Sequence, residues 1–126
     1  MTSGAGAWSA RPRWRLTLRN RIALGPGKAD LLEAIGRTGS ISSAARALGM
    51  SYRRAWLLVE TMNRSFARPL VATSRWRGRG ARLTADGARV LDLYRRIESA
   101  SLAAAREPLT ELKRLLRPPA RKSRRA

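Results

Sequence analysis

Hydrophobic positions along the chain change from a period of two to a period near that of an α-helix. In residues 13–19, Trp14, Leu16 and Leu18 alternate with polar side chains, which is typical of a β-strand with one buried face. The preceding segment is small and rich in glycine. We therefore expect residues 1–12 to form a flexible tail.

Three helices are predicted after this strand, each with one apolar stripe. The first covers residues 28–37 and ends at Gly39, because glycine readily adopts the left-handed conformation that closes a helix. Ser40 and Ser51 are the predicted N-caps of the second and third helices, which are joined by a turn at Gly49. The stripes expected to face the core are Leu31, Leu32 and Ile35; Ile41, Ala44, Ala45 and Leu48; and Ala55, Val59, Met62 and Phe66, joined by Tyr52 and Trp56.

Two short extended segments and a long helix complete the pattern. The extended segments, near 70–74 and 81–84, flank a loop of glycine and arginine, as in a β-hairpin. The helix after the N-cap Thr84 reaches residue 117, and Pro108 is expected to interrupt or restart it. Its apolar and small residues repeat close to a heptad, which predicts a dimerisation seam formed by Val90, Tyr94, Ile97, Ser101 and Ala104.

The order of the elements predicts a mainly α-helical fold with a small β-hairpin wing: a winged helix-turn-helix with a long C-terminal dimerisation helix. The chain then divides into the tail 1–12, a DNA-binding domain over 13–83, a helical dimerisation region over 84–117 and a basic disordered tail over 118–126.

The charge of the chain favours a polyanionic partner. Its 126 residues include 27 Lys and Arg against 8 Asp and Glu, a formal net charge of +19. It has no cysteine or histidine, hence no thiolate metal site and no imidazole base, so we expect no catalytic residue, metal or cofactor. With no long apolar run and no signal-peptide core, we expect no membrane partner and a cytoplasmic location at the nucleoid.

The third helix, over residues 51–66, is the predicted recognition helix for double-stranded DNA. Such helices contact base edges from their first turn, where arginine can bind guanine bidentately. By its angle on the helix, the side chain of Leu57 points outward, where it could contact a thymine methyl or the wing. Trp56 is expected in the core. The predicted DNA-binding residues of the helix are Ser51, Tyr52, Arg53, Arg54 and Arg64.

The wing, over residues 73–83, is the second predicted DNA contact. Glycines at 78 and 80 allow its loop to follow a phosphate ridge or enter the minor groove. Trp76 is expected at the tip of this loop, and because arginines flank it we do not expect it in the core. The predicted phosphate-binding residues are Arg75, Arg77, Arg79 and Arg82.

Two sequence segments resemble the N-terminal DNA-binding domain of the ModE family of molybdate-responsive regulators, which is related to the domain of LysR-type regulators. They are GSISSAARALGMSYRRAW, over Gly39–Trp56, and the glycine-rich wing that closes with ARLT at Ala81–Thr84. The resemblance covers about residues 13–100. It implies a bacterial transcription regulator whose recognition residues fall on Ser51–Arg54 and whose helix after Thr84 serves dimerisation.

Full-length members of that family continue into small β-barrel domains that bind molybdate. A chain of 126 residues has no room for them, so we expect no molybdate site here. The leading hypothesis is a sequence-specific regulator that binds a near-palindromic operator as a homodimer. The alternatives are a nonspecific nucleoid-associated DNA-coating protein and a protein-interaction adaptor that uses the leucine face after Pro108.

Overall fold

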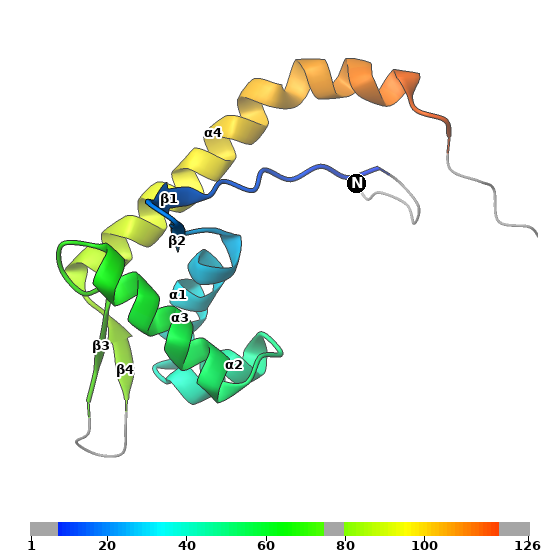
Figure 1. The fold of residues 1–126 in the computed structure, drawn as a ribbon. Coiled ribbons are helices and arrows are strands. Elements are labelled where there is room, and N and C mark those ends of the chain that lie inside the picture. Colours follow the sequence, from blue (N-terminus) through cyan, green and yellow to red (C-terminus); the bar gives the residue numbers. More distant parts are fainter. Residues whose placement is uncertain (1–7, 75–79, 119–126) are drawn as a thin grey trace, which may run out of the picture.

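The computed structural model describes residues 8–74 and 80–118. Three helices, two small hairpins and one long helix make up this part of the chain (Figure 1). In chain order the elements are β1 (Leu16–Leu18), β2 (Arg21–Leu24), α1 (Pro26–Thr38), α2 (Ile41–Ala47), α3 (Tyr52–Ser65), β3 (Val71–Thr73), β4 (Ala81–Leu83) and α4 (Ala85–Leu115). Within the described ranges, no helix is long and apolar enough to cross a membrane.

The predicted helix ends at Gly39, Ser40 and Ser51 are confirmed, whereas α1 begins at Pro26, two residues before the expected start. Gly39 ends α1 in the left-handed conformation, with φ of 74°, and its amide donates to the Ile35 carbonyl. The Ser40 hydroxyl accepts from the amide of Ser43 at 3.0 Å, as an N-cap should. The core between these helices contains the expected stripe of α1 and, from α3, Ala55, Val59 and Met62, whereas Tyr52 and Trp56, which were expected to join them, are 57% and 39% exposed. The largest members of the core are Leu31, Leu32, Ile35, Val59 and Met62, with Leu70 and Tyr94 from outside these helices.

The wing hairpin β3–β4 is fixed at its base to two neighbouring elements. Its strands are antiparallel, with Val71 opposite Leu83. The amide of Ala81 donates to the Gly39 carbonyl at the end of α1 at 2.9 Å. At the start of α4, the Thr84 amide donates to the carbonyl of Leu70 at 2.9 Å, and Gly87 is buried against the same carbonyl.

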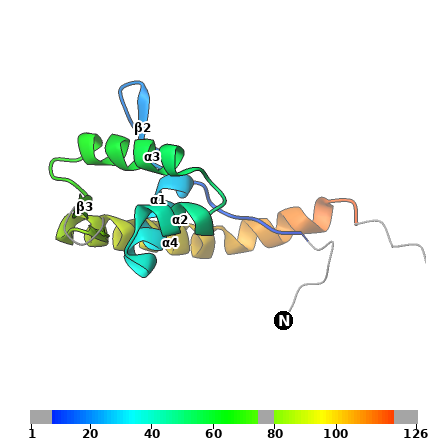
Figure 2. The same cartoon turned by 90° about the horizontal axis from the view of Figure 1, so that it is seen from below.

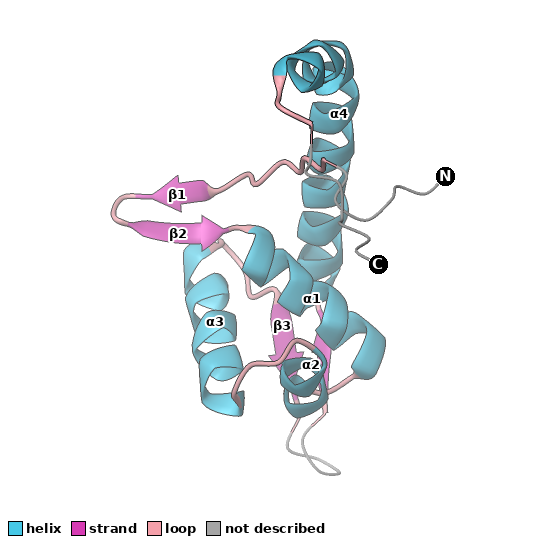
Figure 3. Cartoon of the chain, turned by 90° about the vertical axis from the view of Figure 1, so that its right-hand side faces the viewer, coloured by secondary structure: helices cyan, strands magenta, loops and turns pink. Residues whose placement is uncertain are grey.

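The long helix α4 is continuous through Pro108, so the proline does not end it. Figures 1 and 3 show that α4 changes direction in its second half, as expected where a proline removes a backbone hydrogen bond. Arg95 holds α4 to α1 through ion pairs with Asp30 at 2.9 Å and Glu33 at 2.7 Å, and it also pairs with Glu98. Burial opposes the charge of Arg95, but these hydrogen bonds outweigh burial and raise the pKa of Arg95 above its ordinary value.

The N-terminal segment departs from the prediction of one half-buried strand. It forms a two-stranded hairpin, β1–β2, which turns at Arg19 with φ of 58° and stands out beside α3 (Figures 2 and 3). Leu16 and Leu18 are 41% and 44% exposed, so the apolar face of this strand is not buried within the chain. The second strand was missed because arginine seldom adopts the left-handed conformation that this turn requires.

Candidate nucleic-acid interface

The first turn of α3 presents a cationic, exposed end. The Ser51 hydroxyl accepts from the Arg54 amide at 3.1 Å, which fixes the start of the helix. Ser51, Tyr52, Arg53 and Arg54 are all exposed, and Tyr52 is 57% exposed. Neither arginine forms an ion pair with any residue in the ranges 8–74 and 80–118. Both guanidinium groups are therefore available to a ligand.

The helix-turn-helix geometry depends on the turn between α2 and α3. Gly49 has φ of 69°, a left-handed conformation that disfavours a side chain. The amide of Met50 donates to the Ala45 carbonyl at 3.0 Å, so the turn is tied back to α2. The first turn of α3 follows this turn and lies at the same edge of the molecule as the end of β3 and the start of β4 (Figure 1).

The wing contributes one described arginine to this edge. Arg82 is exposed on β4, between the buried Ala81 and the half-buried Leu83, and therefore points away from the core. Its guanidinium makes no ion pair within the described residues. The other predicted wing residues, Arg75, Trp76, Arg77 and Arg79, lie outside the described residues.

Asn63 connects α3 to the wing and was missed in the sequence. Its Oδ1 accepts from the amides of Leu70 at 2.9 Å and Val71 at 3.1 Å, and its Nδ2 donates to the Val71 carbonyl at 3.1 Å. One side chain thus sets the position of β3 relative to α3. The only signal in the sequence was an asparagine, a poor helix former, in the last turn of a predicted helix.

Replacing Asn63 by alanine should lower the free energy of unfolding by about 2 kcal/mol, because two part-buried amides lose their acceptor. Urea denaturation measures this loss. Asn63→Asp is the matched comparison, since its carboxylate still accepts from both amides but cannot donate to the Val71 carbonyl, and it should recover part of the stability. Equal unfolding free energies for Asn63→Ala and Asn63→Asp would contradict this role of the side chain.

The outer face of α3 differs from the prediction at Trp56. This side chain is 39% exposed and not part of the core, because only the stripe of Ala55, Val59 and Met62 is buried. Leu57 points outward as expected and is 47% exposed. The predicted contact Arg64 is exposed two to three turns beyond the first turn.

Glu60 is an unexpected acid on this outer face. Glu60 follows Arg53 by seven residues, or about two helical turns, and therefore lies on the same side of α3 as Arg53. It is exposed, and it makes no ion pair with the residues that the structure describes. A carboxylate at this place repels phosphates, but it can accept a hydrogen bond from the amino group of cytosine.

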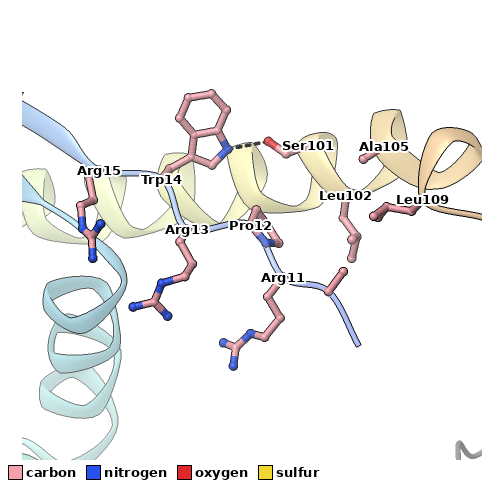
Figure 4. A pocket seen from close by; sticks show the side chains of 10 residues that line it. Arg11, Pro12, Arg13, Trp14, Arg15, Ser101, Leu102, Ala105 and Leu109 are labelled. Atoms are coloured by element: carbon pink, nitrogen blue, oxygen red, sulfur yellow. Dashed lines mark hydrogen bonds between the residues drawn. The ribbon is translucent and has the colours of Figure 1, made fainter. Parts of the chain in front are cut away.

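The predicted dimerisation seam is divided between the inside and the outside of the chain. Tyr94 is only 1% exposed, and its hydroxyl donates to the Trp14 carbonyl at 2.7 Å. The indole of Trp14 donates to the Ser101 hydroxyl at 2.6 Å, so residues 10–15 lie along α4 and form a cleft with it (Figure 4). Val90 packs against the core. Ile97 and Ala104 alone among the five are exposed, and a role in dimerisation stays a prediction.

Comparison with known proteins finds a family with a similar helix-turn-helix. Residues 28–88 match the family described as bacterial regulatory helix-turn-helix protein, lysR family. The DNA-bound DNA-binding domain of CbnR has a similar fold, with a TM-score of 0.56 and 24% identity over 68% of this chain and 95% of that domain. Full-length CbnR in complex with its target DNA gives a TM-score of 0.52, with 22% identity over 68% of this chain and 28% of CbnR.

Several relatives have a greater sequence identity to this chain. The molybdenum-pterin-binding protein MopB of Rhodobacter capsulatus is 45% identical over 83 residues, or 64% of this chain and 31% of MopB. The molybdenum transport protein ModE of Azotobacter vinelandii is 41% identical over 60% of this chain and 29% of that protein. The DNA-binding transcriptional dual regulator ModE of Escherichia coli is 38% identical over 63% of this chain and 31% of the regulator.

These matches confirm the predicted resemblance and the winged helix-turn-helix fold. They also agree with the expectation that the chain is not an enzyme, since the matched family consists of regulatory proteins. The chain spans 29–31% of the length of the three relatives named.

Proposed function

We propose that this protein is a transcription regulator that binds specific DNA sequences, because residues 28–88 match the lysR family of helix-turn-helix proteins. The first turn of α3 contacts base edges in the major groove, and Arg82 and the loop before it contact the phosphates. The observation that carries the proposal is that Arg53 and Arg54 are both exposed in the first turn of α3. This turn lies at the same edge of the molecule as the end of β3 and the start of β4 (Figure 1). Such a protein acts in the cytoplasm, where bacterial DNA lies.

The protein is proposed to act as a homodimer on a near-palindromic operator. Two copies related by a two-fold axis would place their α3 helices in successive major grooves, about one turn of DNA apart. The exposed length of α4 beyond the α1–α3 body offers the surface for such a pair (Figure 1).

Selection of preferred sites from random duplex DNA tests this function. We expect the bound sequences to converge on an inverted repeat whose half-sites are centred about 10 base pairs apart. A flat sequence profile would instead support a nonspecific DNA-coating protein, which the net charge of +19 also favours.

Glu60→Gln tests whether the acid on α3 contributes to specificity. We expect the variant to bind all duplexes a few-fold more tightly, because a charge that repels phosphates is removed. It should also lose a preference for cytosine at one position of each half-site. Competition binding against single-base variants of the selected site measures both effects. Asp92→Asn on α4, the control with the same charge change, should leave base preference intact, and an unchanged cytosine preference in Glu60→Gln would contradict the contact.

A further inference from the structure

Leu57 and Glu60 lie next to each other on the outer face of α3, directly beyond its first turn. Leu57 is 47% exposed, whereas Leu58 beside it packs against the core. Leu57 follows Arg53 by four residues and Glu60 follows Leu57 by three, so the three side chains are neighbours along one face of the helix. This face continues the surface that enters the major groove under the proposed function.

Glu60 supplies a free hydrogen-bond acceptor at this level of α3. Its carboxylate is exposed and pairs with no cation of residues 8–74 and 80–118. The neighbouring Thr61 hydroxyl donates to the Leu57 carbonyl at 2.9 Å, so the helix itself uses that donor. When a bound duplex excludes water from this face, the carboxylate needs a donor from the duplex. That donor must lie beside an aliphatic side chain.

The major groove presents three pyrimidine edges that these two side chains can distinguish. Cytosine offers its N4 amino group as a donor but has no methyl group, and thymine offers its C5 methyl group beside the O4 acceptor. The O4 atom would repel the Glu60 carboxylate, because both groups are acceptors. 5-Methylcytosine carries the amino donor and the methyl group on adjacent ring carbons. Its edge is the one that matches an acceptor placed beside an aliphatic side chain.

We propose that Leu57 and Glu60 form a site for 5-methylcytosine, in which Glu60 accepts from the N4 amino group and Leu57 packs on the C5 methyl group. Cβ atoms three residues apart on a helix are separated by about 5–6 Å, so both side chains can reach adjoining atoms of one base. Arg53, one turn earlier, is placed to bind the guanine of an adjacent base pair. This inference rests on the proposed function and adds that affinity for the operator depends on cytosine methylation.

Competition binding of the full-length chain to the site selected from random DNA tests the proposal. 5-Methylcytosine is placed where the preference for cytosine depends on Glu60. It should tighten binding about fourfold for each methyl group, the effect of burying one such group. Thymine at the same position should bind more weakly than unmethylated cytosine. Equal affinities for methylated and unmethylated duplexes, or weaker binding of the methylated duplex, would overturn the proposal.

Two variants separate the roles of the two side chains. Leu57→Ala should keep the preference for cytosine over thymine but lose the gain from methylation. Glu60→Gln should keep that gain and bind thymine as well as 5-methylcytosine, because its amide can also donate to O4. Leu115→Ala, at the far end of α4 where the side chain is 82% exposed, is the control and should keep both effects. A Leu57→Ala variant with the full gain from methylation would contradict the contact.

Deoxyuridine distinguishes one recognised base from two. If Leu57 contacts the methyl group of a thymine in a neighbouring base pair, replacing that thymine by deoxyuridine should weaken binding, and Leu57→Ala should abolish the difference. This result would overturn the single-base site. The proposal predicts that deoxyuridine at the flanking positions leaves the affinity unchanged.

Failure of this inference can be told apart from failure of the proposed function. If the selected sites converge on one sequence but methylation has no effect, the methylcytosine site is refuted and the DNA-binding proposal stands. If no sequence is selected, the regulatory function is contradicted. In that case, a preference for methylated over unmethylated random duplexes that Leu57→Ala abolishes would still support the site.

Discussion

Gly87→Ala is expected to lower the free energy of unfolding by about 3 kcal/mol. A Cβ at this position would lie 2.0 Å from the Leu70 carbonyl oxygen and 3.0 Å from its carbon. The carbonyl cannot easily move, because it also accepts a hydrogen bond from the Thr84 amide at 2.9 Å. The start of α4 and the base of the wing must separate to admit the methyl group. Urea denaturation followed by circular dichroism measures the loss.

Gly27→Ala is the matched control for this prediction. Position 27 lies in the first turn of α1, and a Cβ there meets no atom within 4 Å. Alanine is a better helix former than glycine, so this variant should gain up to about 1 kcal/mol. Similar unfolding free energies for the two variants would show that α4 does not pack on Leu70 as closely as the structure places it.

Arg53→Ala and Arg54→Ala should each weaken binding to the selected DNA site by roughly ten- to a hundredfold, the range of one bidentate contact with guanine. The loss should be specific: each variant is expected to stop distinguishing base pairs at one position of the half-site. Because both side chains are exposed and unpaired in the described structure, the thermal stability of the protein should not change. Fluorescence anisotropy with a panel of single-base variants, at fixed salt, measures the effect.

Arg82→Ala supplies the contrast on the wing. A phosphate contact carries no base information, so this variant, like Arg77→Ala, should weaken all duplexes by a similar factor. It should also reduce the slope of log affinity against log salt by about 1. Arginine variants of α3 that keep the unmodified base preference would refute the assignment of α3 as the recognition helix.

Local signals in the sequence were sufficient for most of the helix-turn-helix. Gly39, Ser40 and Ser51 mark helix ends by conformational preference or by a side-chain hydrogen bond, and both are properties of the residue itself. The α1 stripe and the α3 residues Ala55, Val59 and Met62 identified the core because burial follows the helical period. The exposure of Arg53 and Arg54 followed from the same reasoning, whereas Tyr52 was expected to join the stripe and is exposed.

Features that depend on distant contacts could not be predicted in this way. Asn63 bonds to Leu70 and Val71 only because the chain turns back after α3, and no local pattern indicates that turn. The burial of Tyr94 depends on Trp14, 80 residues earlier in the chain. Trp56 is exposed because the buried stripe of α3 is narrow, and the sequence of α3 alone does not show how wide a stripe the rest of the chain covers.

The distribution of carboxylates has a consequence for how the molecule approaches DNA. Two of the eight acids lie on α1, five on α4 and Glu60 on α3, whereas residues 61–85 hold none. Residues 61–85 therefore hold six arginines with no carboxylate among them to offset their charge. In the field of a DNA duplex, this concentration of positive charge would draw the wing side of the molecule toward the phosphates before contact. A protein held by such contacts could move along the duplex while searching for its site.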